Sequence, residues 1–159
     1  MKGQDTLFSH KSDEHGTPQW LYNKLHTEYR FTLDPCATDQ NAKCALYYTK
    51  DQNGLAQSWA HHNIYINPPY SETKLWVEKA IYEVENNDCP LVVMLLPSRT
   101  GMKWYTRGIM QHYSKLIFIE GRLKFEGQEN SAPFDSIIVV FKKGTRFPEI
   151  EVWSNKNVD

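Results

Sequence analysis

The chain has 159 residues, of which 40% are hydrophobic and 23% are charged, and its formal net charge is −1. This length suits one domain with one core, and the near-neutral charge argues against a strongly basic nucleic-acid-binding module. No stretch approaches the roughly eighteen consecutive apolar residues of a membrane span, and residues 1–16 lack the apolar run of a secretory signal, so we expect a cytoplasmic protein. The three cysteines and six histidines lack disulfide or metal-ligand spacings, so we expect reduced cysteines and no metal site.

The first predicted elements are a helix and a short strand. Thr17-Pro18 has the composition of a helix start, with Thr as N-cap and Pro at the first helical position. Apolar or aromatic residues then recur at every fourth position of residues 21–29, which predicts a helix there. A short strand at residues 31–33 follows and runs directly into Asp34.

The rest of the chain alternates strands with helices. Further strands are predicted at residues 46–49, 64–66, 91–96, 116–119 and, as the last one, 136–141. Helices are predicted at residues 72–86 and 102–113. The apolar residues of the first of these helices should form one core-facing stripe: Leu75, Trp76, Ala80, Ile81 and Val84. Because helices separate the strands until the final two, the pattern predicts an α/β fold with a mostly parallel sheet and a C-terminal antiparallel hairpin.

Asn67-Pro68-Pro69-Tyr70 directly follows the predicted strand 64–66. In a plain loop, the prolines would end the strand and the tyrosine would pack in the core. The same residue types also suit methyl transfer to an exocyclic amine. The Asn67 side-chain oxygen and the Pro68 carbonyl would accept hydrogen bonds from the amine, and Tyr70 would lie against a planar substrate. Holding two reactants in line then needs no acid, base or nucleophile.

This tetrapeptide resembles the signature of S-adenosylmethionine-dependent amino-methyltransferases, which act on adenine N6, cytosine N4 or a protein glutamine amide. Further segments are similar to the phage DNA N6-adenine methyltransferase (Dam) family: Thr17–Gln19, Leu33–Ala37, Asn41–Cys44, Gly54–Leu55, Leu96–Thr100 and Gly121–Phe125. They are spread over most of residues 12–141. The resemblance implies a Rossmann-like fold, S-adenosylmethionine as methyl donor, and an adenine flipped out of double-stranded DNA.

The resemblance also implies the residues of the site. The catalytic residues would be Asn67, Pro68, Pro69 and Tyr70. The cofactor-binding residues would be Thr17, Pro18, Asp34, Pro35, Cys36, Ala37, Asn41 and Asn67. Asp34 would bind the ammonium group of the cofactor's methionine end. The alternatives are a helix cap for Thr17 and a strand-ending turn for Asp34. Two features depart from the pattern of such enzymes: residues 36–39 replace the usual glycine-rich turn, and no acidic residue obviously ends the second strand. A residue in 51–55 is a candidate contact for the cofactor adenine.

Basic residues gather between Arg99 and Lys124. A solvated surface is the simpler interpretation, and contact with DNA phosphates is the functional one. The residues expected to contact DNA are Arg99, Lys103, Arg122, Lys124 and Phe125. Tyr70, with Phe125 or Phe134 opposite, is expected to hold the flipped base, although each of these aromatics would also suit the core.

We expect residues 1–15 to form a flexible arm and residues 16–159 to form a single methyltransferase domain without a separate target-recognition domain. Such a domain would read a short, degenerate site, or would act as a homodimer on a palindrome. The alternatives are an amino-methyltransferase acting on cytosine N4, RNA or protein glutamine, and a catalytically inactive nucleic-acid-binding module. The expected setting is the cytoplasm of a bacterium or of a phage-infected cell.

Overall fold

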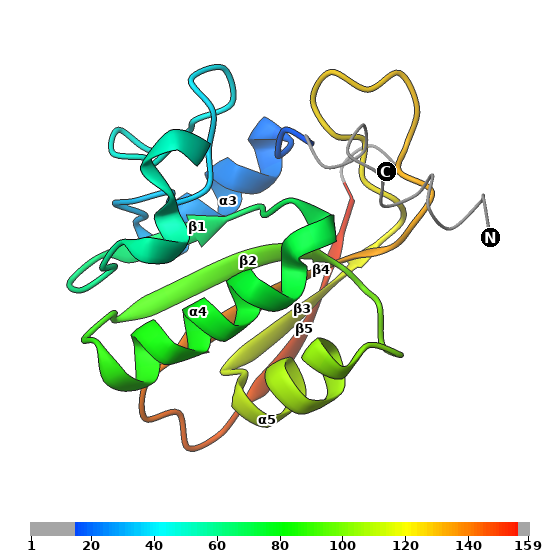
Figure 1. The fold of residues 1–159 in the computed structure, drawn as a ribbon. Coiled ribbons are helices and arrows are strands. Elements are labelled where there is room, and N and C mark those ends of the chain that lie inside the picture. Colours follow the sequence, from blue (N-terminus) through cyan, green and yellow to red (C-terminus); the bar gives the residue numbers. More distant parts are fainter. Residues whose placement is uncertain (1–14, 156–159) are drawn as a thin grey trace.

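The computed structural model describes residues 15–155, which form an α/β fold (Figure 1). The arm expected at residues 1–15 therefore lies, apart from His15, outside the described residues. The helices are α3 (Gln19–Tyr29), α4 (Thr73–Asn86) and α5 (Met110–His112), with a π-helical segment (Trp104–Ile109) before α5 and short 3-10 helices at Lys50–Gln52, Gly54–Ala56 and Tyr70–Glu72. The strands are β1 (Asn63–Ile66), β2 (Leu91–Pro97), β3 (Lys115–Glu120), β4 (Ser136–Lys142) and β5 (Glu149–Ser154).

The strands form one mixed sheet in the order β1-β2-β4-β3-β5. β1 is parallel to β2 and β3 is parallel to β5, whereas β4 is antiparallel to both of its neighbours. β4 therefore runs opposite to the other four strands. The expected antiparallel pair is present as β3 and β4, but the prediction that it ends the fold is wrong, because β5 follows. β5 alternates glutamate with apolar residues at the edge of the sheet and is mostly exposed, so it lacks the buried pattern of the other strands.

Helices cover both faces of the sheet. α4 and α5 lie in front of it in Figure 1 and α3 lies behind it. One core joins α4 and the segment 104–109 to one face of the sheet, and a second core joins α3 to the other face. β2 lies between the two cores and is buried at every position, as expected for a strand covered on both sides.

The apolar stripe of α4 differs from the prediction at one position. Trp76, Ala80 and Val84 are buried as expected, but Leu75 is 49% exposed. The buried positions of α4 recur three to four residues apart, which turns position 75 away from the sheet.

Two predicted strands, at residues 31–33 and 46–49, are reduced to isolated bridges. Leu33 pairs in parallel with Ile64 of β1, and Asp34 pairs in parallel with Tyr47. Backbone hydrogen bonds continue the ladder, since Tyr65 N–H donates to Leu33 O and Tyr48 N–H donates to Asp34 O. The segment that ends at Asp34 therefore lies directly beside β1, the strand that precedes Asn67.

The carboxyl ends of β1, β2 and β3 meet at one edge of the sheet because these strands run in the same direction. The segments that leave this edge are residues 67–72 after β1, residues 98–103 after β2 and residues 121–135 after β3. In open α/β sheets, ligands bind beyond the carboxyl ends of the strands. This edge is therefore where the fold is expected to hold a site.

Candidate active site

A cavity of about 520 Å³ opens at this edge of the sheet. Its size lies in the range of roughly 300–1,000 Å³ that is usual for small-molecule sites. The lining residues come from four parts of the chain: His15, residues 35–41, residues 49–55 and residues 67–76. The cavity is therefore bounded by the turn after Asp34 on one side and by the segment after β1 on the other.

The structure brings together most residues that the sequence analysis assigned to a cofactor. Those that line the main cavity are Pro35, Cys36, Ala37, Asn41 and Asn67. Thr17 and Asp34 line a small adjoining pocket, which shares Cys36, Asn41 and Asn67 with the cavity. Pro18 lines neither of these two pockets and instead sits at the start of α3.

Thr17 does not cap α3, so that prediction is wrong. The helix begins at Gln19 with Pro18 in the N-cap position, one residue later than expected, and no side chain within the described residues caps it. The Thr17 hydroxyl lies instead 2.5 Å from the Tyr65 hydroxyl and 3.2 Å from Asn67 Nδ2. Thr17 thus contacts side chains of the β1 region instead of capping the helix.

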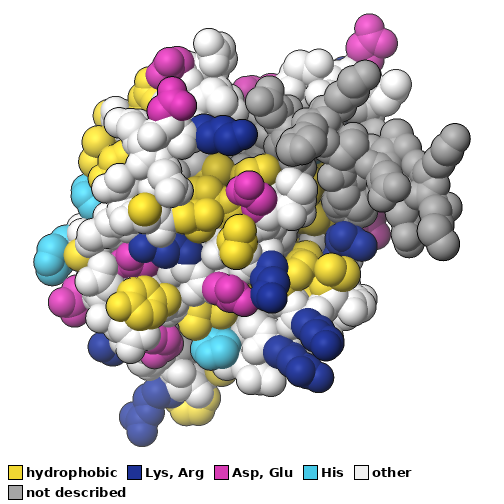
Figure 2. All heavy atoms as spheres, in the orientation of Figure 1, with side chains coloured by type: hydrophobic (Ala, Val, Ile, Leu, Met, Phe, Trp, Pro, Cys, Tyr) yellow, Lys and Arg dark blue, Asp and Glu magenta, His cyan; other side chains and the backbone are white. Residues whose placement is uncertain are grey.

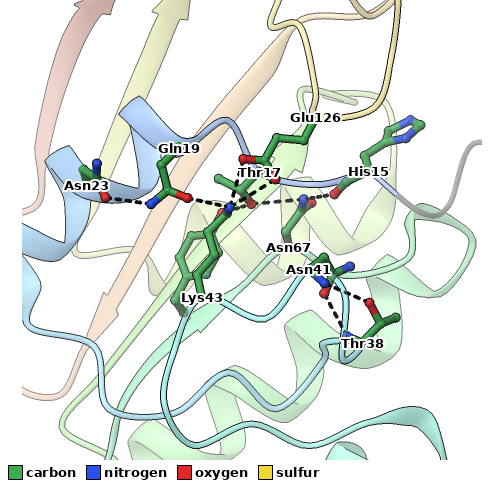
Figure 3. Close-up of polar contacts among 10 residues, drawn as sticks. His15, Thr17, Gln19, Asn23, Thr38, Asn41, Lys43, Asn67 and Glu126 are labelled. Carbon is green, nitrogen blue, oxygen red and sulfur yellow. Dashed lines mark hydrogen bonds and ion pairs between the residues drawn. The ribbon is translucent and has the colours of Figure 1, made fainter.

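The turn after Asp34 is held by hydrogen bonds between neighbouring residues. The Asp34 carboxylate accepts from the Cys36 backbone N–H at 3.0 Å. Thr38 N–H donates to Asn41 Oδ1, and Asn41 N–H donates to the Thr38 hydroxyl (Figure 3). Burial removes water from Asp34 and raises the pKa of its carboxyl to about 7, although the Cys36 N–H opposes this shift. Asp34 therefore both shapes the turn, as its alternative interpretation expected, and places a carboxyl group beside the cavity.

The segment 49–55 packs closely against this turn. A Cβ atom on Gly54 would lie 1.9 Å from the Pro35 carbonyl oxygen, a distance that no side chain tolerates. Trp59 Nε1 donates to the Gly54 carbonyl at 3.0 Å and holds the segment from the other side. Asn53, Gly54 and Leu55 line the cavity, within the segment expected to meet the cofactor adenine.

Several lining residues were not assigned to the cofactor from the sequence: Thr49, Lys50, Ser71, Glu72 and Trp76. Glu72 and Trp76 are one helical turn apart, and Trp76 Nε1 donates to Glu72 Oε2 at 3.3 Å. The signal that would have indicated Ser71 and Glu72 is their position just after the Asn67-Pro68-Pro69-Tyr70 segment.

The Asn67 amide is oriented by contacts on both of its ends. Asn67 Nδ2 donates to the His15 carbonyl at 2.5 Å and to the Thr17 hydroxyl at 3.2 Å, and Tyr70 donates to Asn67 Oδ1 at 3.3 Å. Figure 3 shows the backbone of His15, and not its ring, facing Asn67. A backbone carbonyl only accepts hydrogen bonds, so the amide nitrogen must face His15 and Thr17. The amide oxygen points the other way.

Aromatic rings surround Tyr70. Its ring centroid lies 5.6 Å from that of His15, 6.4 Å from Phe125 and 5.4 Å from Phe134. Tyr70 and Phe125 are 6% and 2% exposed, whereas Phe134 is partly buried. Burial raises the pKa of the Tyr70 phenol above its usual range. The three aromatics expected to hold a flipped base thus lie together, two of them in core positions.

A charged contact joins three distant segments near the site. Lys43 Nζ lies 3.0 and 3.1 Å from the two Glu126 carboxylate oxygens and 2.9 Å from Gln19 Oε1 (Figure 3). Glu126 N–H also donates to the Gly16 carbonyl at 2.8 Å. These bonds hold residues 121–135 against the start of α3, and nothing in the sequence spacing indicated them.

The basic residues expected to meet DNA follow two strands that end at the site edge. Lys103 follows β2 and is exposed, and Arg122 and Lys124 follow β3 and are exposed, whereas Arg99 is half-buried. Figure 2 shows Lys and Arg side chains gathered at the lower right of this face, over the segment that follows β2. Phe125, also expected to contact DNA, is in the core. A role of these residues in DNA binding stays a prediction.

The described residues, 15–155, also bear on metal binding and membrane association. Within this range no group of three His, Cys, Asp or Glu side chains is arranged to hold a metal ion. No helix of the same range has the length and apolar character needed to cross a membrane. Cys36, Cys44 and Cys89 form no disulfide, and the last two are buried.

Comparison with known proteins relates the chain to one family. Residues 4–159 match the family described as DNA N-6-adenine-methyltransferase (Dam). The DNA N-6-adenine-methyltransferase of Escherichia phage T1 is 32% identical over 109 residues, which cover 67% of this chain and 44% of that protein. The DNA N-6-adenine-methyltransferase of Haemophilus phage HP1 is 31% identical over 130 residues, which cover 79% of this chain and 74% of that protein. The chain thus spans less than half of the first relative and about three quarters of the second.

Proposed function

Because the chain belongs to the DNA N-6-adenine-methyltransferase (Dam) family, we propose that it transfers a methyl group from S-adenosylmethionine to adenine N6 in DNA. The observation that carries this proposal is the orientation of Asn67. Both hydrogens of its amide are bonded to the protein, and it lines the main cavity. The amide oxygen accepts one hydrogen bond, from Tyr70, and its second lone pair is available to an incoming amine.

We assign the fold to the Rossmann-like methyltransferases, and a fold of this kind supports the proposed activity. A single reversed strand, β4, lies between β2 and β3, and Asp34 and Asn67 both leave the carboxyl edge of the sheet. Open α/β sheets bind nucleotide-like ligands at this edge. We assign S-adenosylmethionine to the cavity there, since the volume of about 520 Å³ accommodates a molecule of that size.

The groups around the cavity fit the methionine end and the adenine ring of S-adenosylmethionine. When bound, this cofactor supplies an electrophilic methyl group on a sulfonium. Asp34 would pair with the ammonium of its methionine end, and the buried position strengthens such a pair. The backbone at residues 53–55, which line the cavity, would lie along the adenine ring. Gly54 has no side chain, and this lets the segment pack directly against the Pro35 turn.

The residues after β1 would hold the target amine. Asn67 Oδ1 and the Pro68 carbonyl would accept its two hydrogens and aim the nitrogen lone pair at the methyl carbon. In the transfer, the nitrogen–carbon bond would form as the carbon–sulfur bond breaks to leave a neutral thioether, and the surplus amine proton would pass to water. Positioning of this kind supplies a large part of the rate without an acid or a base.

The base itself would have to leave the duplex, since adenine N6 is not reachable in a stacked pair. Tyr70, which bonds to Asn67 Oδ1, would lie against such a base, and Phe134, whose ring lies 5.4 Å from that of Tyr70 at nearly right angles, would extend this aromatic wall. Lys103, Arg122 and Lys124 would contact the phosphates on either side. Binding should therefore weaken steeply as the salt concentration rises.

The test is transfer of a tritiated methyl group from S-adenosylmethionine to duplex DNA, RNA and protein offered separately. Digestion of the DNA to nucleosides should place the label on N6-methyladenine. Label found on N4-methylcytosine, on RNA alone or on protein alone would overturn the proposal. Methylation of plasmids read by long-read sequencing would then give the recognised site and would test whether it is short or palindromic.

A further inference from the structure

Thr17 makes two contacts that its place in the chain does not explain. It lies just before α3 and does not cap that helix. Its side chain is 4% exposed, and its hydroxyl contacts the Tyr65 hydroxyl and Asn67 Nδ2 at 2.5 and 3.2 Å. Buried hydroxyl groups are costly unless they are hydrogen-bonded, and Thr17 satisfies its hydroxyl entirely with side chains from the β1 region.

The strand explains why Tyr65 and Asn67 face the same partner. Side chains alternate across a strand, so residues 65 and 67 point to the face that α3 covers, whereas Ile64 and Ile66 point to the other core. The segment that carries Thr17 leads directly into α3 on that face. The Thr17 hydroxyl is thus held between a buried tyrosine and the amide proposed to hold the substrate.

The hydrogen-bond inventory determines the direction of each contact to Asn67. The His15 carbonyl has no hydrogen to give, so the amide NH₂ donates to it, and the second amide hydrogen is directed to Thr17 Oγ1. The Tyr65 phenol is neutral, because burial raises its pKa well above the usual range. It therefore has one hydrogen and free lone pairs to complete the bonding of the threonine hydroxyl. An amide turned by half a rotation would set its oxygen against the His15 carbonyl oxygen and lose that bond, and it would require the Thr17 hydroxyl to donate instead of accept.

We infer that Thr17, supported by Tyr65, is a positioning residue that holds the Asn67 amide with its oxygen toward the substrate amine. The inference rests on the proposed function and adds to it a role for a residue that the family resemblance implied only for cofactor binding. The two roles have different kinetic consequences. A residue that orients Asn67 affects kcat, whereas a residue that binds the cofactor affects the cofactor Kd.

The chain offers matched variants for the test. Thr17→Val keeps the shape and removes the hydroxyl, and Thr17→Ser keeps the hydroxyl. Tyr65→Phe removes the supporting hydroxyl, and Tyr22→Phe is its control. Tyr22 is also buried, its ring packs edge-on against Tyr65 at 5.2 Å, and its own hydroxyl contacts Cys44 instead of Asn67.

We expect Thr17→Val to lower kcat about tenfold, the effect of losing one hydrogen bond that orients a reacting group. Thr17→Ser should restore most of the rate, Tyr65→Phe should cost less than Thr17→Val, and Tyr22→Phe should leave the rate unchanged. The cofactor Kd, measured by calorimetry, should stay within about twofold for all four variants. An unchanged kcat in Thr17→Val, or a raised Kd with normal kcat, would overturn the inference.

A second measurement does not depend on turnover and so separates this inference from the proposed function. The side-chain amide of Asn67 can be followed by NMR in ¹⁵N-labelled protein and assigned by its loss in Asn67→Ala. In wild type and Thr17→Ser, both amide protons should be bonded and slow to exchange, and in Thr17→Val one of them should shift and exchange faster. Identical Asn67 signals in Thr17→Val and wild type would refute the positioning role even if the protein methylated DNA. A wild-type protein that methylates nothing would refute the proposed function alone.

Discussion

The two walls of the cavity are built in different ways. The wall made by residues 35–55 consists of turns whose backbones approach closely, with hydrogen bonds between residues two or three positions apart. The wall made by Asn67 and Tyr70 depends on side-chain bonds to residues about fifty positions away in the sequence. The first wall depends on close backbone packing, so a substitution that adds atoms should disrupt it. The second wall depends on the direction of hydrogen bonds, so a substitution that removes polar atoms at constant volume should disrupt it.

The largest effect should come from removing the amide at the centre of the second wall. Asn67→Ala deletes the acceptor proposed for the target amine, and we expect the rate of DNA methylation to fall by about 10² to 10³, as when one polar group that stabilises a transition state is lost. Asn67 is only partly buried, so the melting temperature should change little. The measurement is single-turnover methyl transfer together with thermal unfolding. Full activity in Asn67→Ala would contradict the assignment of this wall.

The matching experiment on the first wall adds one methyl group. Gly54→Ala would place its Cβ atom 1.9 Å from the Pro35 carbonyl oxygen, so the two segments must separate. Overpacking of this kind costs about 1–3 kcal/mol, and we expect cofactor affinity to fall about tenfold or more, together with a lower melting temperature. Calorimetric titration with S-adenosylmethionine measures the first quantity.

Gly101→Ala is the control for this substitution. Gly101 has no heavy atom within 4 Å of its ideal Cβ position, and its backbone is not in the left-handed region. It should therefore bind cofactor as the wild type does. Equal affinities for Gly54→Ala and Gly101→Ala would show that the close approach at Pro35 does not shape the site.

A smaller effect should appear as a pH dependence confined to the first wall. Burial raises the pKa of Asp34 from 3.8 to about 7. A raised carboxyl pKa contributes stability that is fully present below pH 3.8 and is lost as the pH rises through about 7. In the cofactor-free protein, Asp34→Asn should therefore gain melting temperature over wild type as the pH rises from 4 to 7, and the difference should level off above that.

Cofactor binding should show the opposite trend. The ammonium group favours the ionised carboxylate, so wild-type affinity should rise with pH up to about 7, while Asp34→Asn should bind weakly with little dependence on pH. Isothermal titration at several pH values measures both. Parallel profiles for the two proteins would remove Asp34 from the cofactor site.

The difference between the walls also explains what the sequence could predict. α3 and α4 were found because their apolar residues recur with the helical period, and β2 and β4 were found because each is a continuous apolar run. The site residues after Asp34 and Asn67 were found because parallel strands bring their carboxyl ends to one edge. β5 was missed because it is an edge strand with half of its residues polar.

Long-range side-chain contacts had no such signal. The Thr17 contact to Asn67 spans fifty positions, and the Lys43 contact to Glu126 spans 83. The sequence contains the residues of each pair, but only the register of the folded sheet brings them together. A helix cap was the nearest local use for Thr17, and the structure replaces it with a contact across the fold.

The smallest expected effect concerns the Lys43–Glu126 contact, which joins Lys43 of the first wall to residues 121–135 beside the second one. The Lys43 side chain is 10% exposed and that of Glu126 is 44% exposed, so solvent screens the pair only in part. Lys43→Gln should lower stability by up to about 1 kcal/mol, the upper range for partly exposed pairs. It should raise the KM for DNA more than it lowers kcat, because the segment that it holds carries Arg122 and Lys124.

Lys74→Gln is the control, since Lys74 pairs with Glu78 at 4.0 Å with both side chains more than 60% exposed, and it should change neither stability nor KM. If the two variants behave alike, the segment after β3 is held by its apolar contacts, Leu123 and Phe125 being buried, and the charged contact is only a surface pair. If Lys43→Gln alone raises the KM for DNA, the second wall extends through Glu126 to the surface that meets the phosphates.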